Sequence, residues 1–151
     1  MIYKYFEDVE VGEKIVSRGR TITQTDVTLF SMFTGNWEAI HSDMEYAKTT
    51  AFGQILVQGS LAFVIGPGLL PVPPEGPIMA FYGMDRMRLV KPIFAGDTLH
   101  VEREIIGKQD KRPDAGIVDV QMTFKNQHDE TVQVNVMKLL VAKRHYEEAS
   151  S

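Results

Sequence analysis

The stretch that decides the fold is the apolar run GSLAFVIGPGLL at residues 59–70. It contains no charged side chain, which predicts a helix buried nearly all round. The wider apolar segment 55–70 is shorter than the roughly 20 residues that a membrane-spanning helix needs. Gln58 and a Gly-Pro-Gly triplet also interrupt it. We therefore expect a core helix rather than a membrane span.

Segments that alternate between apolar and polar residues follow this helix. They lie at 99–105, 118–124 and 132–136, and their period of two predicts an antiparallel meander with one face buried. A further strand is expected at 78–90, bent at Gly83. The pattern as a whole predicts an α+β fold in which an antiparallel sheet wraps one apolar helix.

The segments before the apolar helix are shorter. Residues 14–22 predict a strand, and Thr23 with Asp26 is close to a capping box at the start of a helix. This helix is expected to end at Gly35. A second short helix is expected over residues 44–48.

Polar and proline-rich segments connect these elements. We expect loops at 71–77 and 109–116, a hairpin turn at 126–130 and a polar tail from about residue 144. Because no repeat or linker divides the chain, we expect a single domain over residues 1–151.

The composition excludes several classes of function. Sixteen basic and twenty acidic side chains give a net charge of −4, which argues against nucleic acid or an anionic membrane as a partner. The chain has no cysteine, which excludes thiolate nucleophiles, cysteine metal sites and disulfides. No signal peptide is visible, so we expect a cytoplasmic protein. The sequence shows no metal-ligand cluster or nucleotide fingerprint, and no cofactor or metal is expected.

One loop carries groups that can move protons. His41 follows apolar Ile40 between the two short helices, and Asn36, Glu38 and Asp43 lie within five residues of it. An imidazole oriented by a carboxylate is common equipment for proton transfer. A structural histidine with its hydrogen bonds satisfied is the alternative. The chain's other histidines occupy positions where we expect exposure to solvent, and they are His100, His128 and His145.

The start of the apolar helix, at Gln58, Gly59 and Ser60, is the second candidate feature. A helix N-terminus presents unpaired backbone N–H groups, and a glycine there allows a ligand to approach closely. Such groups can bind a thioester oxygen and stabilise an enolate-like anion. A glycine needed only for helix packing is the alternative.

These stretches resemble the signature of the MaoC-like dehydratases, which include the R-specific enoyl-CoA hydratases. The resemblance is carried by TGNWEAIHSD at 34–43, EYA at 45–47, Phe52-Gly53 and Gln58-Gly59, and it extends over roughly residues 3–142. It implies a hot-dog fold and a thioester of coenzyme A or acyl carrier protein as substrate. It also implies a homodimer or higher homo-oligomer that needs no cofactor.

The family uses an aspartate to activate water and a histidine for the second proton. His41 stands at the histidine position, and Asn36 stands at the aspartate position. An amide cannot accept a proton at neutral pH. Three possibilities follow: Glu38 supplies the carboxylate, His41 acts as both acid and base, or the site binds an acyl thioester without hydrating it.

The remaining expected roles follow from the same resemblance. Gly59 would offer its N–H to the thioester oxygen, with Gln58 and Ser60 beside it, Trp37 in the pocket wall and Asp43 as a supporting carboxylate. Phenylalanines are further expected lining residues, and these are Phe30, Phe33, Phe52 and Phe63. An apolar strand containing residues 139–141 would form the sheet edge that a second copy pairs with. A thioesterase using Glu38 and Gly59 is a competing activity, and a non-catalytic acyl-CoA-binding subunit is another.

Overall fold

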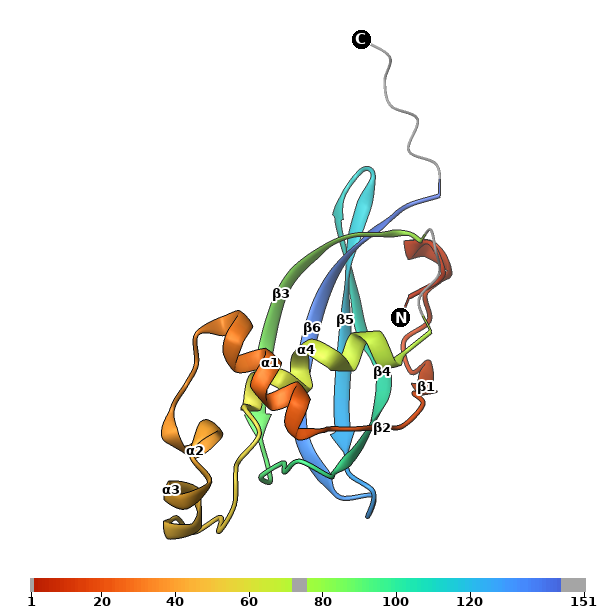
Figure 1. Ribbon diagram of the computed structural model, residues 1–151. Coiled ribbons are helices and arrows are strands. Elements are labelled where there is room, and N and C mark those ends of the chain that lie inside the picture. The colour runs from red at the N-terminus through yellow and green to blue at the C-terminus, as the bar shows by residue number, and fades with distance from the viewer. Residues whose placement is uncertain (1, 72–75, 145–151) are drawn as a thin grey trace.

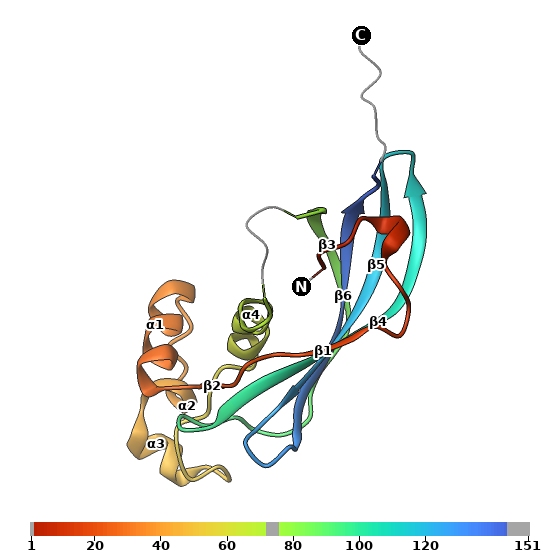
Figure 2. The same cartoon turned by 90° about the vertical axis from the view of Figure 1, so that its right-hand side faces the viewer.

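The computed structural model describes residues 2–71 and 76–144, and in it helix α4 (Gly59–Leu69) crosses the concave face of a curved antiparallel sheet (Figure 1, Figure 2). The strand order is β1-β4-β5-β6-β3, and β2 also pairs with β4. The long strands are β3 (Ile78–Leu89), β4 (Thr98–Arg112), β5 (Ala115–Lys125) and β6 (Thr131–Ala142). This arrangement confirms the predicted α+β class. The expected tail from about residue 144 and the middle of the 71–77 loop lie outside the described residues.

The predicted strand over residues 14–22 is two short strands, β1 (Lys14–Val16) and β2 (Arg20–Thr21). They follow a 3₁₀ helix, η1 (Phe6–Asp8), and both pair with β4. Between them the Ser17 hydroxyl accepts the N–H of Val101 at 2.8 Å. A side-chain oxygen thus takes the place of a backbone carbonyl, which interrupts the ladder.

The first helix forms as predicted. In α1 (Gln24–Thr34) Thr23 and Asp26 make the reciprocal hydrogen bonds of a capping box. Gly35 ends the helix with φ 74°, a left-handed conformation that glycine adopts without strain, and its N–H donates to the Ser31 carbonyl.

The expected loop around His41 contains a short helix, α2 (Ala39–Ser42), immediately before α3 (Met44–Thr49). Asp43 caps α3 by accepting the backbone N–H groups of Glu45 and Tyr46. The prediction of an irregular loop was wrong at this point because one turn of helix is too short to show a periodic pattern.

The predicted polar loop 109–116 is also wrong. Strand β4 continues to Arg112 and β5 begins at Ala115, so the two strands are joined by a tight hairpin. The hairpin tip projects beyond the helix-covered part of the sheet (Figure 1). Its polar residues therefore reflect exposure to solvent rather than irregular backbone. The turn predicted at 126–130 is confirmed, with Asn126 N–H donating to the Glu130 carbonyl at 3.0 Å.

Helix α4 is not buried nearly all round in a single chain. It buries Leu61, Ala62 and Leu69, whereas Val64 is 58% exposed. The sheet covers one side of the helix, and α1 lies on the opposite side, where Gln58 at the start of α4 bonds to Ser31 of α1 (Figure 2). Val64 remains exposed between these layers, so the apolar character of this part of the helix is unexplained by the fold of one chain alone.

Residues 139–141 do not form a sheet edge. They lie in β6, which is hydrogen-bonded to β5 on one side and β3 on the other. The edge strand next to β6 is β3, which carries three charged side chains whereas β6 carries one. The composition of a strand does not show where the chain places it in a sheet.

A close approach between α4 and the sheet holds the two layers together. At Gly66, an added Cβ would lie 2.3 Å from the Phe124 ring. Phe124 is fully buried on β5, so its ring has little room to move away. At Gly68, two residues later in the same helix, an added Cβ would meet open space.

We expect Gly66→Ala to lower the free energy of unfolding by about 1–3 kcal/mol, the range found for overpacking a core. Gly68→Ala is the matched control and should raise it by up to about 1 kcal/mol, because alanine favours the helix more than glycine does. Urea titrations of both variants measure the difference. Equal effects would show that α4 does not lie this close to the sheet.

A partly buried ion pair ties the N-terminal segment to β4. The side chain of Arg103 is 1% exposed and donates to Glu13 at 3.0 Å, and the exposed Lys4 donates to the same carboxylate at 2.9 Å. Hydrogen bonds from Lys4 and from Arg103 hold the pKa of Glu13 below its ordinary value of 4.5. The ionised carboxylate is therefore favoured in the folded state.

We expect Glu13→Gln to destabilise the protein by about 2 kcal/mol at neutral pH, because the buried guanidinium loses its counter-charge. Since the pKa of Glu13 is lowered on folding, its contribution is complete above pH 4.5 and is lost as pH falls through the folded value. The difference between wild type and variant should therefore shrink at acid pH in urea titrations. Lys4→Gln keeps the buried pair and is the control. A difference independent of pH would contradict this assignment.

Candidate functional site

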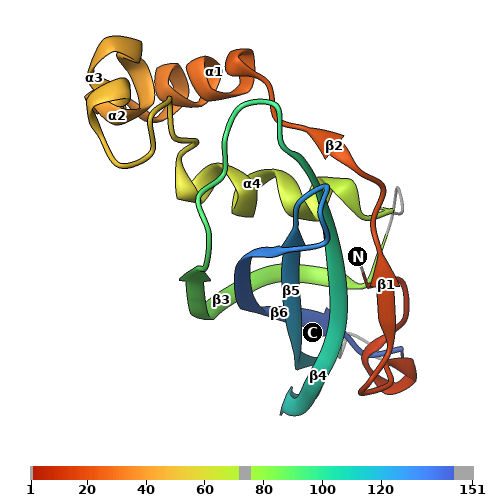
Figure 3. The same ribbon diagram turned by 90° about the horizontal axis from the view of Figure 1, so that it is seen from below.

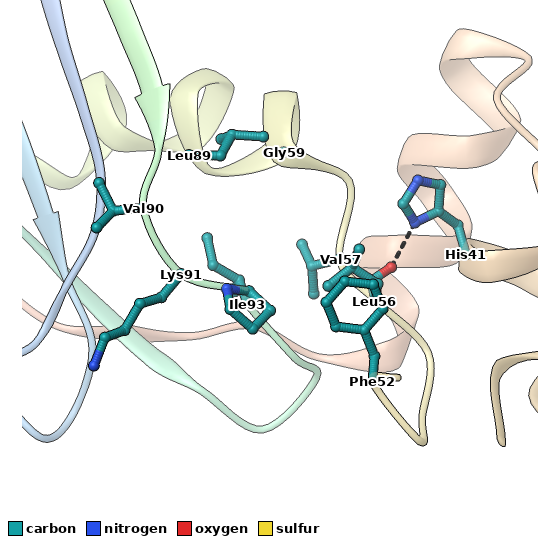
Figure 4. Close-up of a pocket in the computed structure, with 10 residues that line it drawn as sticks. His41, Phe52, Leu56, Val57, Gly59, Leu89, Val90, Lys91 and Ile93 are labelled. Carbon is teal, nitrogen blue, oxygen red and sulfur yellow. Dashed lines mark hydrogen bonds between the residues drawn. The ribbon is translucent and has the colours of Figure 1, made fainter. Parts of the chain in front are cut away.

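A pocket of about 430 Å³ lies between α2, the start of α4 and the segment after β3 (Figure 4). His41 and Gly59, which are far apart in sequence, both line it. The other lining residues are mostly apolar, and they are Phe52, Leu56, Val57, Leu89, Val90, Lys91, Pro92 and Ile93.

The imidazole of His41 is held by the backbone of Leu56. Nδ1 lies 2.6 Å from the Leu56 carbonyl oxygen, shown by the dashed line in Figure 4, and the side chain is 9% exposed. A carbonyl oxygen can only accept, so Nδ1 carries the proton and donates it to this bond. In the neutral ring Nε2 is then unprotonated and can accept a proton.

The same short segment positions His41 relative to the pocket wall. The Leu56 N–H donates to the Ile40 carbonyl at 3.1 Å, which fixes α2. The Val57 N–H donates to the Ile93 carbonyl at 2.9 Å. Leu56 and Val57 therefore connect the histidine to the opposite wall through backbone bonds.

Glu38 stands beside His41 but outside the pocket lining. Its Oε2 lies 3.8 Å from His41 Nε2, and its side chain is 73% exposed. The carboxylate can stabilise a protonated imidazole by Coulomb attraction. Its exposure to water weakens that attraction.

Asn36 uses its side chain within its own loop. Its Oδ1 accepts the N–H of Glu38 at 3.3 Å, and its own N–H donates to the Thr34 hydroxyl at 3.3 Å. Trp37 is exposed, and neither Asn36 nor Trp37 is among the lining residues. Of the expected aromatic lining residues, the structure brings Phe52 to this pocket.

The other residues named from the sequence lie next to the site without lining it. The buried amide of Gln58 donates to the Ser31 hydroxyl at 2.7 Å and to the Val27 carbonyl at 3.3 Å, which joins α1 to the start of α4. Ser60 is exposed, and Asp43 caps α3. Their proposed roles at a ligand remain predictions.

Gly59 opens α4, and no side chain caps this helix start. The Leu61 N–H donates to the Gln58 carbonyl at 2.9 Å, whereas the N–H groups of Gly59 and Ser60 have no intrahelical partner and carry partial positive charge. An added Cβ at Gly59 would lie 2.4 Å from Leu89, so the glycine also has a packing reason. The two explanations suggested by the sequence are compatible at this position.

Sequence reasoning missed one whole wall of the pocket, residues 89–93. These residues follow an edge strand, and it is the crossing of α4 over the sheet that brings them near Gly59 (Figure 3). Lys91 in this wall donates to Glu130 at 2.6 Å. The predicted end of the strand at residue 90 was the available signal, but it does not say which helix end the following segment meets.

A group of possible metal ligands lies away from this pocket. His100, Glu102 and Asp129 come together where the start of β4 meets the turn between β5 and β6, a gathering that the sequence did not predict. The Lys125 ammonium lies 2.7 Å from Glu102 and 3.3 Å from Asp129, so a cation already neutralises them. His100 is half-buried there rather than exposed as expected.

Within residues 2–71 and 76–144, no helix has the length and apolarity required to cross a membrane.

The chain is similar in sequence to known proteins. The family model described as MaoC like domain matches residues 7–135. A β-methylmalyl-CoA dehydratase from Chloroflexus aurantiacus is 30% identical over 93% of this chain, and an (R)-specific enoyl-CoA hydratase from Rhodospirillum rubrum is 28% identical over 71% of it. The match covers 40% of the length of the dehydratase and 73% of that of the hydratase. This chain therefore spans less than half the length of several curated relatives, with shares of 29% to 42% in the dehydratase and two others.

Solved structures share the fold. A structure described as a monoamine oxidase regulatory protein from Archaeoglobus fulgius is 33% identical, with a TM-score of 0.88 over 95% of this chain and 97% of that one. A Mycobacterium tuberculosis protein with a double hotdog fold has a TM-score of 0.82 over 98% of this chain and 47% of that one, at 17% identity. The predicted hot-dog fold is thus confirmed, and this chain belongs to the MaoC-like domain family.

Proposed function

We propose that this protein is a hydro-lyase that adds water to an enoyl thioester and removes it from a 3-hydroxyacyl thioester. The observation that carries the proposal is that His41 and the start of α4 at Gly59 line one largely apolar pocket. The relatives named as a hydratase and a dehydratase support the reaction class. Coenzyme A or acyl carrier protein would carry the acyl group, in a cytoplasmic protein that needs no cofactor.

In the hydration direction, His41 Nε2 takes a proton from water while the water oxygen bonds to C3 of the enoyl group. The electron pair of the double bond moves onto the thioester carbonyl, which becomes an enolate oxygen. The N–H groups at the start of α4 stabilise this oxygen by hydrogen bonds and by the helix dipole. Return of the proton to C2 completes the addition of water.

His41 is the better placed of the two candidate bases. It lines the pocket, and the Leu56 carbonyl fixes the tautomer with a free Nε2. Glu38 is largely exposed and does not line the pocket, although its carboxylate lies 3.8 Å from the same Nε2. We therefore assign both proton transfers to His41 and the stabilisation of its charged form to Glu38.

Two alternative functions make different demands on these residues. A thioesterase needs a carboxylate in the pocket, and Glu38 is not in its lining. A non-catalytic acyl-CoA-binding subunit is favoured by Asn36, which stands where the family has its aspartate. With crotonyl-CoA and longer enoyl-CoA esters, hydration removes the enone absorbance, hydrolysis releases free thiol, and pure binding does neither.

We expect His41→Gln to lower kcat for enoyl-CoA hydration by about 10²–10⁴-fold, because the variant cannot transfer a proton. Glu38→Gln should lower kcat by about tenfold or less, since its exposed charge is screened by water. The readout is the loss of enone absorbance over time, with His128→Gln as a control at a surface turn. Equal losses in the His41 and Glu38 variants would transfer the role of base to Glu38.

We also expect Asn36→Asp to raise the rate of enoyl-CoA hydration in the same assay by restoring the family's carboxylate.

We further propose that the protein is a homodimer formed through the β3 edge and the outer face of α4. Phe63 of α4 and Phe81 of β3 have ring centroids 6.3 Å apart, so the two surfaces are continuous. The exposed apolar residues of this surface are Val64, Met79, Phe81, Tyr82 and Met84. A second copy would pair with the free edge of β3 and cover the apolar side of α4.

We expect light scattering after gel filtration to give about 34 kDa, twice the 17.0 kDa of one chain. Val64→Glu should produce monomers, because it places a charge in the proposed interface. Val16→Glu is the matched control on the opposite edge strand, where Val16 is similarly exposed, and should leave the dimer intact. A monomeric wild type at micromolar concentration would rule out this dimer.

A further inference from the structure

Two amide side chains on β6, Gln133 and Asn135, are fully buried without hydrogen-bond partners. Each is 0% exposed. Within the described part of the chain, no donor or acceptor is bonded to the amide nitrogen or the amide oxygen of either residue. Buried polar groups in folded proteins nearly always have hydrogen-bond partners, so two buried amides without partners on one strand point to a ligand.

The strand register places both amides under α4. Gln133 pairs with Phe124 on one side and with Leu89 on the other, and directly paired residues face the same side of a sheet. Phe124 lies against Gly66, and Leu89 lies against Gly59. Gln133 therefore lies between the two side chains that contact the glycines of α4, Leu89 at Gly59 and Phe124 at Gly66.

Gln133 is a direct neighbour of the pocket wall. Leu89 lines the pocket that contains His41 and Gly59, and adjacent strands are about 4.8 Å apart. Gln133 on β6 is therefore one strand spacing from Leu89 on β3, further from the pocket than Leu89 is. Neither amide lines the pocket itself, so an acyl chain whose carbonyl binds at Gly59 would have to extend past Leu89 by about one strand spacing to reach Gln133.

We propose that Gln133 and Asn135 bind an uncharged oxygen function, a hydroxyl or ketone, on the acyl chain of the substrate. This proposal rests on the proposed function, because it names the substrate class of the same site. It adds that the substrate has a polar group a few carbons beyond the reacting double bond, rather than a plain alkyl chain.

The geometry fits a single oxygen held between the two amides. Residues two apart on a strand have Cα atoms about 6.8 Å apart and face the same side. One oxygen at about 2.8 Å from each amide spans about 5.6 Å. A hydroxyl can accept from one amide nitrogen and donate to the other amide's oxygen, and a ketone can accept from both nitrogens.

The charge of the surroundings favours an uncharged group over a carboxylate. Arg103 lies in the same row of the sheet, since it pairs with Met122 and Met122 pairs with Asn135. Its guanidinium is already paired with Glu13 at 3.0 Å. Among the described residues its Nε has no hydrogen-bond partner, but Arg103 lies on β4, two strands from Asn135, which is about 9.6 Å. A carboxylate beside Asn135 would therefore have only neutral amides within hydrogen-bond reach, and burying an unpaired charge is costly.

The first test compares matched substrates with the wild-type protein. The probes are hex-2-enoyl-CoA and 6-hydroxyhex-2-enoyl-CoA, with the five-carbon pair as a second length. We expect kcat/KM to favour the hydroxylated ester by about a hundredfold at one of these lengths, because a buried site built for a polar group rejects an analogue that lacks it. Equal values, or a preference for the plain chain at both lengths, would overturn the proposal. So would a preference for the matching ester that ends in a carboxylate.

The second test removes the amides while keeping their shapes. Gln133→Met and Asn135→Leu should each reduce the preference ratio about tenfold or more, and each should have a Tm at least as high as wild type, because an unpaired buried amide is removed. Gln121→Met is the matched control, since Gln121 lies on β5 on the opposite face of the sheet, and it should leave the ratio unchanged. A lower Tm with an unchanged ratio would show that the amides serve the fold alone.

Binding of the corresponding saturated acyl-CoA pair, measured by calorimetry, separates this proposal from the proposed function. If the hydroxylated ester binds more tightly but no ester is hydrated, the hydro-lyase assignment fails and the amide site stands. If plain esters are hydrated without any preference in rate or binding, the amide site fails and the hydro-lyase assignment stands. If no ester binds or reacts, both are overturned.

Discussion

The close approach of α4 to the sheet is the constraint on which the rest of the structure depends. Gly59 and Gly66 leave no room for a Cβ, because Leu89 and Phe124 occupy that space. These two contacts fix both the height of the helix above the sheet and its direction across it (Figure 2). The N-terminus of α4 is consequently held at the pocket, which Gly59 and His41 both line.

Local sequence patterns predicted the elements better than their arrangement. The capping box of α1 and the alternating strands depend on residues close in sequence, and both were predicted correctly. The position of β6 inside the sheet depends on β3 pairing with it across a long stretch of chain, which no local pattern contains. For the same reason the exposed side of α4 could not be foreseen: an apolar helix has the same sequence whether its own sheet or a second chain covers it.

The residues of the candidate site also differ in how far the sequence alone could identify them. His41 and Gly59 were singled out from residue chemistry and from the family resemblance, and the fold brings them to one pocket. The neighbours of His41 in sequence were harder to place, because backbone hydrogen bonds turn the Asn36 side chain into its own loop. The wall at residues 89–93 carries no chemical signature and belongs to the site only through topology.

The partner of His41 Nδ1 bears on how the proton moves. A carboxylate at Nδ1 would favour the charged imidazolium, whereas the Leu56 carbonyl fixes the same tautomer with a neutral acceptor. The protonated ring is then stabilised chiefly by Glu38, whose carboxylate is largely in water. In the proposed mechanism one histidine both takes and gives the proton. The replacement of the family's aspartate by Asn36 and the neutral hydrogen bond at Nδ1 are consistent with each other and with this proposal, because neither places a negative charge in the pocket beside the ring.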